Sequence, residues 1–260
     1  MSYGVSASRL DVSISVVIPA YNRPAYLKEA VESALRQSIR PHEIIIADNG
    51  TERHGLEFSS GLVRTIVLPA RIGASAARNA GAKAATGDYL AFLDDDDWWE
   101  PRFLECALKR SVESGASIVY GRKDIWEDGV QKLYKSPKES DLTIDQVLVR
   151  NPGTGGQNLF IKRSVFEGIG GFDPSLPAAN DIAFVLDALI SGNRIVCCHD
   201  AVSVLRTHEG ERLRNDPMRR IPFVLKYRKY MTVSALIKRI GKLIARGALY
   251  RVRSLSQRFR

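Results

Sequence analysis

The chain has 260 residues, 45% of them hydrophobic, and a formal net charge of +9. This length and apolar content exclude a disordered protein and suffice for one large domain, with or without an appendage. The three cysteines offer neither a disulfide framework nor a spaced metal-binding pattern, which favours a reducing, cytoplasmic compartment. The chain starts without the apolar core of a signal peptide, and nowhere do 18 uncharged apolar residues run together, so we expect no membrane-spanning segment.

Strand-like and helix-like segments alternate over residues 12–121, as in βαβ units with a mostly parallel sheet. The expected strands are 13–18, 43–47, 63–68, 88–93 and 117–120. One expected helix starts near Pro24 and repeats apolar residues at helical spacing, and two more cover 74–85 and 101–114. The sequence therefore predicts an α/β sheet flanked by helices.

The pattern changes after Gly121. Asp128-Gly129 predicts a hairpin between 122–126 and 130–134, and the glycines of 151–156 predict a loop. A strand over 158–161, a helix over 181–190 and two short strands over 195–199 and 202–206 complete the globular part. We divide the chain into an N-terminal extension (1–11), two halves of one domain (12–121 and 122–216) and a C-terminal extension (217–260).

Four consecutive aspartates, Asp94 to Asp97, directly follow the apolar run 89–93. Ligands of open α/β sheets bind at the carboxyl ends of strands, and grouped carboxylates repel one another unless a cation or solvent offsets them. Oxygen ligands favour a hard ion such as Mg²⁺ or Mn²⁺. A solvated acidic turn is the alternative interpretation.

Several segments together resemble family 2 glycosyltransferases with the GT-A fold. They are SVVIPAYNR (15–23), IIADNGT (45–51), ARNAG (77–81), FLDDDD (92–97), GGFD (170–173), Asn180-Asp181 and RTH (206–208). The resemblance covers roughly residues 12–210 and depends on the order and spacing of the segments. It implies an inverting transfer of a sugar from a nucleotide diphosphate to an acceptor hydroxyl, with 12–121 binding the nucleotide sugar and 122–216 the acceptor.

The resemblance assigns nucleotide contacts to Pro19, Tyr21, Asp48, Arg78 and Asp94. A carboxylate such as Asp48 accepts hydrogen bonds from a base or ribose, and Tyr21 offers a face for stacking. Two alternatives stay open, because Asp48 could cap a following helix and Arg78 could be a solvated helix residue. Asn49 replaces a second aspartate that is common in the family.

The resemblance also assigns metal ligation to Asp96 and His208, with Mn²⁺ or Mg²⁺ as cofactor. The metal would stabilise the charge that develops on the departing diphosphate. His208 could instead be a surface histidine, since lone histidines often are. The glycines of 153–156 could wrap the diphosphate or acceptor, or could simply connect two elements.

Asp181 matches the family's catalytic base. An attacking hydroxyl must lose its proton, and a carboxylate within hydrogen-bond reach can accept it. The alternative is that Asp181 caps a helix. Asn180 stands where the family usually has Glu, which leaves the base in place but removes a neighbouring charge.

The resemblance implies a metal-dependent hexosyl- or N-acetylhexosaminyl-transferase of cell-envelope or extracellular polysaccharide assembly, with a UDP-sugar as the default donor and a glycan or lipid-linked acceptor. One alternative is a catalytically inactive GT-A module that binds nucleotide sugars. Another, a nucleotidyltransferase, is disfavoured because the turn after the first strand, Pro19-Ala20-Tyr21-Asn22, is not a glycine-rich phosphate loop.

The C-terminal extension carries most of the basic excess. Residues 217–260 hold 13 Lys+Arg and no acidic residue, while residues 1–216 hold 25 basic and 29 acidic residues, a net charge of −4. Within 234–250, apolar residues share one helical face and cationic residues another, which predicts either a peripheral anchor on the anionic inner face of the cell membrane or a helix packed on the domain. We expect no nucleic-acid partner, because no recognition motif is present and the rest of the chain is acidic.

Overall fold

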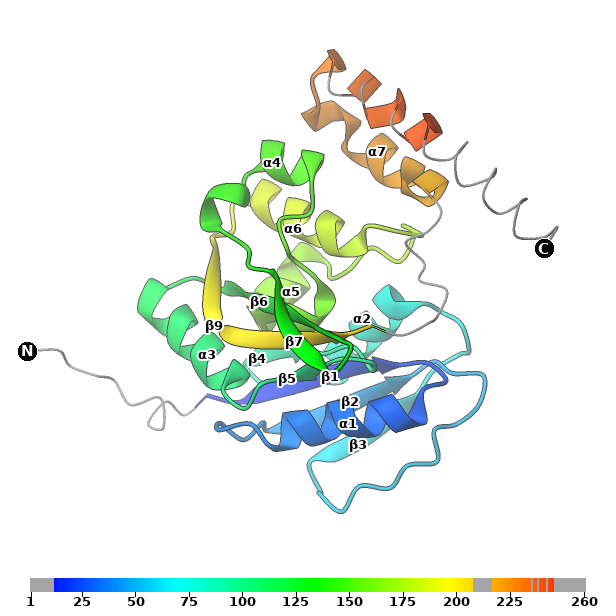
Figure 1. Ribbon diagram of the computed structural model, residues 1–260, viewed down its shortest axis with the longest axis vertical. Helices are drawn as coiled ribbons and strands as arrows, with labels where there is room; N and C mark the ends of the chain where they lie inside the picture. The colour runs from blue at the N-terminus through cyan, green and yellow to red at the C-terminus, as the bar shows by residue number, and fades with distance from the viewer. Residues whose placement is uncertain (1–11, 208–216, 235, 238, 242, 246–260) are drawn as a thin grey trace, which may run out of the picture.

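The computed structural model describes residues 12–207 and 217–245, except 235, 238 and 242 (Figure 1). The predicted N-terminal extension, His208 and the last part of the C-terminal extension lie outside these residues. The described strands are β1 (Ile14–Ala20), β2 (Glu43–Asp48), β3 (Val63–Val67), β4 (Tyr89–Phe92), β5 (Trp98–Trp99), β6 (Ile118–Glu127), β7 (Val130–Lys135), β8 (Leu159–Lys162) and β9 (Ile195–Arg206). The described helices are α1 (Pro24–Leu35), α2 (Ala74–Ala84), α3 (Phe103–Ser114), α4 (Ile144–Val149), α5 (Arg163–Ile169), α6 (Asn180–Ile190) and α7 (Ile221–Tyr227).

The strands form one sheet in the order β3-β2-β1-β4-β8-β6-β9-β5, and β7 pairs with β6 as a hairpin. The part β3-β2-β1-β4 is wholly parallel, as predicted. Beyond β4 the sheet is mixed, because β8 runs antiparallel to both β4 and β6 while β9 runs parallel to β6. β6 therefore runs in the direction of β4, and its carboxyl end lies toward the same edge.

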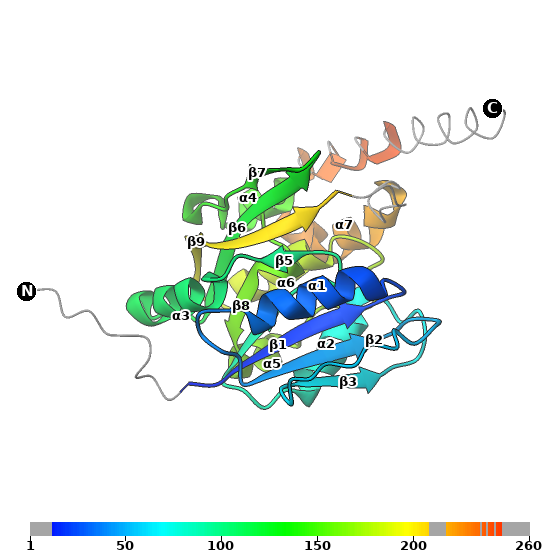
Figure 2. The ribbon, with the colours of Figure 1, turned by 60° about the horizontal axis from the view of Figure 1, so that its bottom comes forward.

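Alternate residues of β1 enter two separate cores, one on each face of the sheet. Val16 and Ile18 pack with Leu27 and other residues of α1, whereas Val17 packs with residues of α2 such as Ala82. Figure 2 shows α1 covering the near face of β1 and β2. Burial on both faces explains why these strands read as unbroken apolar runs.

Small residues of α2 bring this helix close to the sheet. A Cβ added at Gly81 would lie 2.4 Å from Val17 Cγ1, so the approach requires glycine.

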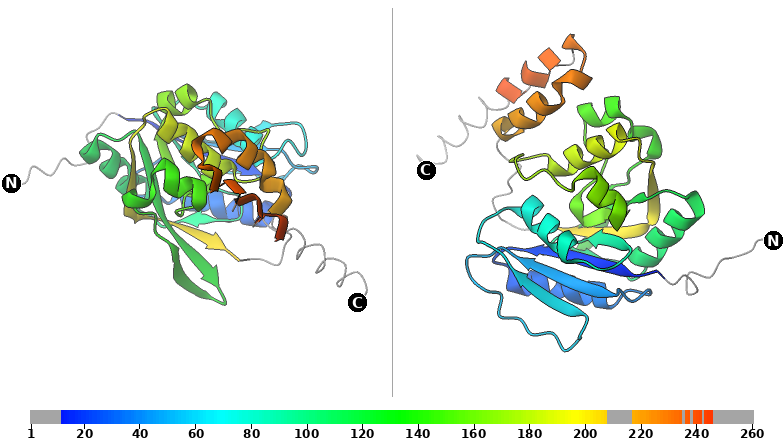
Figure 3. Two further views of the ribbon diagram at one scale, coloured as in Figure 1. Left: turned by 90° about the horizontal axis from the view of Figure 1, so that it is seen from above. Right: turned by 180° about the vertical axis from the view of Figure 1, so that it is seen from behind.

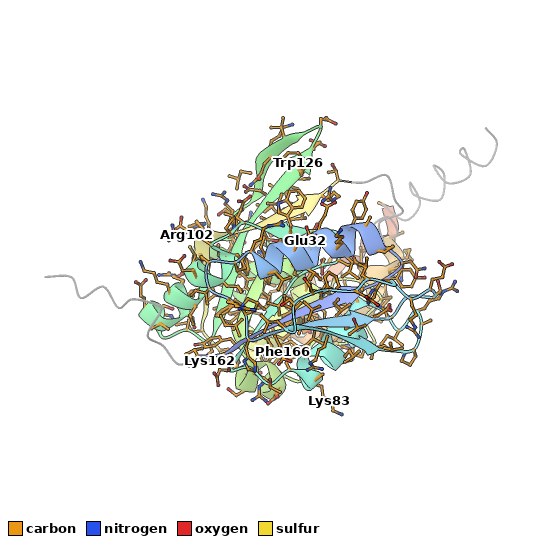
Figure 4. All side chains as sticks on the ribbon, turned by 90° about the horizontal axis from the view of Figure 1, so that it is seen from below. Glu32, Lys83, Arg102, Trp126, Lys162 and Phe166 are labelled. Carbon is orange, nitrogen blue, oxygen red and sulfur yellow. The ribbon has the colours of Figure 1, made fainter. Side chains whose placement is uncertain are left out.

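β6 and β9 are each one strand, and the prediction that each would be two was wrong. The two strands bend together where their register shifts between Gly121 and Arg122, which face Cys198 and Val202 respectively. The polar His199-Asp200 therefore belongs to a bulge inside β9 and does not end the strand. The β6–β7 hairpin projects from the body, and Figure 4 shows Trp126 on it.

Two short elements gave no sequence signal. β5 has two residues and α4 has six, both too short for a periodic pattern. Trp99 of β5 stacks on Phe103 at a centroid distance of 4.3 Å, and its indole N–H donates to Gln157 O at 2.8 Å. Tertiary contacts thus fix β5.

The C-terminal extension begins with a helix that packs on the body. Phe223, Val224 and Tyr227 of α7 are buried in the core that contains α6. Lys226 forms ion pairs with Asp173 and Asp187, and the Tyr227 hydroxyl donates to Asp187 Oδ1 at 2.9 Å. Figure 3 shows α7 (orange) beside α6, with the helical residues that follow (red) on the outer side of α7. No helix within the described ranges is long and apolar enough to span a bilayer.

Gly121→Ala should lower the free energy of unfolding by about 1–3 kcal/mol. The added Cβ would lie 2.4 Å from Ala201 O and 2.8 Å from Phe103 Cε2, at the bend shared by β6 and β9. Urea unfolding followed by circular dichroism measures the change.

Gly168→Ala in α5 is the matched control. Nothing lies within 4 Å of its added Cβ, and alanine is favoured over glycine inside a helix, so this variant should be as stable as the parent or more so. Equal unfolding free energies for Gly121→Ala and the parent would show that the bend accepts a methyl group.

Candidate active site

The predicted site residues gather where the parallel strands end. Ala20 of β1 pairs with Asp48 of β2, and the backbone N–H and side-chain amide of Asn49 both donate to Ala20 O, at 3.0 and 2.8 Å. β4 lies on the other side of β1 and leads directly into the four aspartates. The loops after β1, β2 and β4 therefore share one edge of the sheet, which is the ligand-binding edge of open α/β sheets.

The four aspartates alternate in burial. Asp95 and Asp97 are buried, whereas Asp94 and Asp96 are partly exposed. Asp94 and Asp96 are thus the carboxylates that a ligand at this edge of the sheet can reach.

Asp95 fixes the turn between β1 and α1. Its Oδ2 accepts from the backbone N–H of Tyr21 at 2.8 Å, and its Oδ1 lies 3.2 Å from Arg23 Nη1. Burial raises the pKa of the Asp95 carboxyl to about 7, with a further rise from the charges of Asp96 and Asp94 that the Tyr21 N–H and Arg23 oppose.

Asp97 joins the aspartate loop to the end of β9. Its Oδ1 accepts from the backbone N–H of Arg206 at 3.0 Å. Burial, followed by the charges of Asp94 and Asp96, holds the pKa of the Asp97 carboxyl well above its usual range. The Arg206 guanidinium lies over the rings of Tyr26 and Trp98, at 4.8 and 4.9 Å from their centroids.

Each of the two reachable carboxylates pairs with an arginine. Asp94 forms an ion pair with Arg78 of α2, and Asp96 Oδ2 lies 2.6 Å from Arg23 Nη1. The guanidinium groups of Arg78 and Arg23 therefore offset part of the repulsion within the run. The raised pKa values of the two buried aspartates favour their uncharged forms, which reduces it further. Arg78 is not the solvated helix residue of the alternative interpretation, since its side chain is only 12% exposed.

The donor set suits a hard divalent ion that also binds substrate. No group of three His, Cys, Asp or Glu side chains within the described ranges is arranged as a metal site, and His208 lies outside them. Mg²⁺ and similar ions are commonly held by one or two carboxylates together with substrate phosphates. Asp94 and Asp96 fit that pattern, and they are the residues that would hold the ion.

Asp48 is buried at the end of β2. Its Oδ1 accepts from Gly50 N at 2.9 Å, and its Oδ2 forms an ion pair with Arg53 Nη1 at 3.5 Å. A loop follows β2, so Asp48 does not cap a helix.

The other predicted nucleotide contacts on this side lie at the end of β1. Pro19 lies within β1, and Tyr21, two residues further on, is exposed. Asn22, with φ of 54°, donates to Thr51 Oγ1 at 2.7 Å and so ties the β1–α1 turn to the loop after Asp48.

Asp181 lies in the first turn of α6. The N-cap of α6 is Ala179, so Asp181 is not the cap. Asn151 donates from Nδ2 to Asp181 Oδ2 at 3.0 Å and to Thr154 O at 2.9 Å. The side chain of the preceding Asn180 hydrogen-bonds to Ser75 Oγ of α2.

The glycine-rich loop links Asp181 to the aspartate run. Its Asn151 end holds Asp181, and its Gly156 end contacts the guanidinium of Arg78, where an added Cβ would lie 2.6 Å from Cζ. Lys123 of β6 supports the middle of the loop by donating to Thr154 O at 3.2 Å. The loop is therefore a structured connection between Asp181 and the Arg78–Asp94 pair of the aspartate run.

The sequence analysis assigned no role to four residues of this network: Arg23, Lys123, Asn151 and Arg206. Their partners lie 30 or more positions away in the chain. Arg23 and Arg206 belong to the segments that resemble the family and Asn151 to the predicted loop, but nothing local indicated what these side chains contact.

The comparisons with known proteins agree with the fold and identify the family. A model described as glycosyl transferase family 2 matches residues 15–170, so the chain belongs to this family. A TarS structure from S. aureus (residues 1–349, in complex with UDP-GlcNAc) has a TM-score of 0.65 at 18% identity, covering 90% of this chain and 72% of that one. This likeness confirms the expected GT-A fold.

Two curated relatives cover the same region. An uncharacterized glycosyltransferase of Haemophilus influenzae is 29% identical over 182 residues, which are 68% of this chain and 62% of the relative. The UDP-Glc:alpha-D-GlcNAc-diphosphoundecaprenol beta-1,3-glucosyltransferase WfgD of Escherichia coli is 27% identical over 160 residues, 60% of this chain and 62% of the relative. The matches thus span about 62% of each relative's length.

The raised pKa of Asp95 should make stability fall as pH rises. The folded state keeps a proton that the unfolded chain loses near pH 4, so this contribution is full below about pH 4 and is lost as pH rises toward 7. Relative to Asp95→Asn, the parent should lose roughly 3 kcal/mol of unfolding free energy between pH 5 and pH 8. Urea unfolding in the presence of a chelator measures it.

Asp145→Asn, at an exposed position of α4, controls for the loss of one carboxyl group. A constant stability difference between the parent and Asp95→Asn across this pH range would contradict the raised pKa.

Proposed function

We propose that the chain is an inverting, metal-dependent glycosyltransferase that moves a sugar from a nucleotide-diphosphate donor to an acceptor hydroxyl. The observation that carries the proposal is the loop of residues 151–156, which joins Asp181 to the Arg78–Asp94 pair at the carboxyl edge of β1, β2 and β4. Such an arrangement offers a carboxylate base on one side of a site for an anionic leaving group on the other.

The nucleotide is assigned to the β1–β2 side of this edge. Asp48 lies at the end of β2 as an acceptor for base or ribose donors, and Tyr21 offers an exposed ring beside Pro19. UDP is the default nucleotide, supported by the UDP-sugars in the name of the WfgD relative and in the TarS complex.

The diphosphate is assigned to Asp94, Asp96 and the arginines beside them. A bound Mn²⁺ or Mg²⁺ supplies Lewis-acid stabilisation of the departing diphosphate. Arg78 lies within the protein beside Gly156 and adds a fixed positive charge. Fixed charges require no reorganisation as negative charge develops on the leaving group.

Asp181 is the proposed base. Asn151 holds its Oδ2, and we assign Oδ1 to the acceptor's proton. A single displacement by the acceptor oxygen breaks the bond from the sugar to the diphosphate and inverts the anomeric carbon. The acceptor proton passes to Asp181, and the bonding electrons leave with the diphosphate.

The acceptor is proposed to be lipid-linked and part of envelope glycan assembly. The name of the WfgD relative specifies a diphosphoundecaprenol acceptor. The C-terminal extension suits a membrane surface, because Val233, Ile237, Ile240 and Ile244 are 39–75% exposed at helical spacing while Leu243 packs inward. An exposed apolar stripe in a segment without acidic residues is typical of helices that lie on anionic bilayers.

Asp181→Asn should lower kcat by roughly 10²- to 10⁴-fold while UDP binding is retained, because the amide keeps the shape of the carboxylate but accepts a proton poorly. Mass spectrometry of nucleotide released from a panel of nucleotide sugars, with calorimetry for UDP, measures both quantities.

Asp145→Asn on α4 is the control and should keep the parent's turnover. Near-normal transfer by Asp181→Asn would show that another group is the base. Metal-enhanced UDP binding without turnover of any donor by the parent would favour a binding module over an enzyme.

Replacing Ile237 and Ile244 together by Ser should weaken binding to anionic vesicles at least tenfold, since each buried apolar side chain contributes about 1.5–3 kcal/mol. Co-sedimentation with phosphatidylglycerol-containing and purely zwitterionic vesicles measures it. Point changes are preferable to deletion, because Phe223 of the same extension is part of the core.

The control replaces Val130 and Leu133 by Ser. These side chains are 52% and 65% exposed on the β6–β7 hairpin, a similar apolar loss on another surface. Equal vesicle binding by the Ile237/Ile244 variant and the parent would refute the proposed contact of this stripe with the membrane.

A further inference from the structure

The two arginines that hold Asp94 and Asp96 are constrained to different extents. The Arg78 side chain is 12% exposed, whereas that of Arg23 is 38% exposed. Arg23, the partner of Asp96, is therefore freer to change its side-chain conformation than Arg78, the partner of Asp94.

Arg78 is enclosed on several sides. Its guanidinium lies over the ring of Phe172 at 5.4 Å and against the backbone of Gly156. Leaving Asp94 would require Arg78 to disturb both the core and the glycine-rich loop. Arg78 is thus a fixed partner.

Arg23 reaches the aspartates from the N-cap of α1. Its backbone is positioned by the turn that Asp95 anchors through Tyr21 N, and the guanidinium contacts Asp96 Oδ2 at 2.6 Å and Asp95 Oδ1 at 3.2 Å. The side chain ends at the protein surface, so it can leave Asp96 without unpacking the core. Arg23 occupies Oδ2, one of the two carboxylate oxygens that Asp96 could offer to a cation, and places a positive charge beside the other.

We propose that Arg23 competes with the divalent cation for Asp96, so that the cation binds tightly only when a nucleoside diphosphate gives the Arg23 guanidinium another partner. The inference rests on the proposed function, because it takes Asp96 as a cation ligand. It makes Arg23 a positioning residue that couples cation binding to nucleotide binding.

The physical basis is competition between two positive charges, the Arg23 guanidinium and the divalent cation, for the Asp96 carboxylate. A carboxylate oxygen in a charge-assisted hydrogen bond to a guanidinium has less negative charge to offer an ion, and the nearby guanidinium repels the ion. A diphosphate changes the balance, since guanidinium groups bind phosphate oxygens through two parallel N–H donors. The same diphosphate supplies oxygen ligands to the cation.

The test is the affinity of the intact chain for Mn²⁺, measured from the electron paramagnetic resonance signal of the free ion, with and without UDP. Arg23→Gln should bind Mn²⁺ alone about tenfold more tightly than the parent, a difference of about 1.4 kcal/mol. The factor by which UDP strengthens Mn²⁺ binding should shrink by a similar amount. Arg23→Lys, which keeps the charge but not the two-donor geometry, should lie between them.

Two further variants separate this effect from general changes in charge. Arg36→Gln removes a guanidinium at the other end of α1, where it pairs with Glu32, and should leave Mn²⁺ affinity at the parent value. Asp96→Asn should abolish the gain when combined with Arg23→Gln. Circular dichroism and UDP binding show that each variant is folded.

The outcomes distinguish the inference from the function on which it rests. If the parent binds Mn²⁺ with UDP but Arg23→Gln binds Mn²⁺ alone no more tightly than the parent, the competition is refuted and the proposed function stands. If Mn²⁺ binds no variant with or without UDP, the metal dependence and the competition are both refuted.

Discussion

The structure depends on how four adjacent carboxylates are accommodated at the end of one strand. Each aspartate is used to hold a segment distant in sequence: Asp95 holds the turn after β1, Asp97 the end of β9, Asp94 helix α2 and Asp96 the start of α1. Asp95 and Asp97 are buried with raised pKa values, which favours their uncharged forms. Asp94 and Asp96 form ion pairs with arginines. The same contacts that offset the repulsion between the carboxylates therefore hold the segments of the site together.

The mixed second half of the sheet brings segments of the proposed acceptor side to the same edge as the nucleotide side. β8 runs antiparallel to β4, and β6 and β9 then run in the direction of β4 again. β6 brings Lys123 to the glycine-rich loop, and the end of β9 brings Arg206 to Asp97. The single reversed strand, β8, therefore leaves the carboxyl ends of β4, β6 and β9 on one edge of the sheet.

The sequence predicted the elements with strong local signals. The parallel strands, α1, α2 and α6 follow from apolar runs and helical periodicity, and the site segments follow from resemblance. The pairing of Arg23 with Asp96 and of Asn151 with Asp181 could not be predicted, because each joins residues far apart in the chain. The unbroken β6 and β9 were missed for a different reason. Gly121 and His199-Asp200 are typical of turns, yet here they form a bend shared by two paired strands.

Helix α6 connects the proposed base to the C-terminal extension. It carries Asp181 in its first turn and Asp187, which binds Lys226 and Tyr227 of the C-terminal extension, almost two turns later. The rise along a helix between these positions is roughly 9 Å. Asp181 and the attachment point of the extension therefore lie on one short, continuous helix. A displacement of the extension that moved α6 would also move the Asp181 carboxylate.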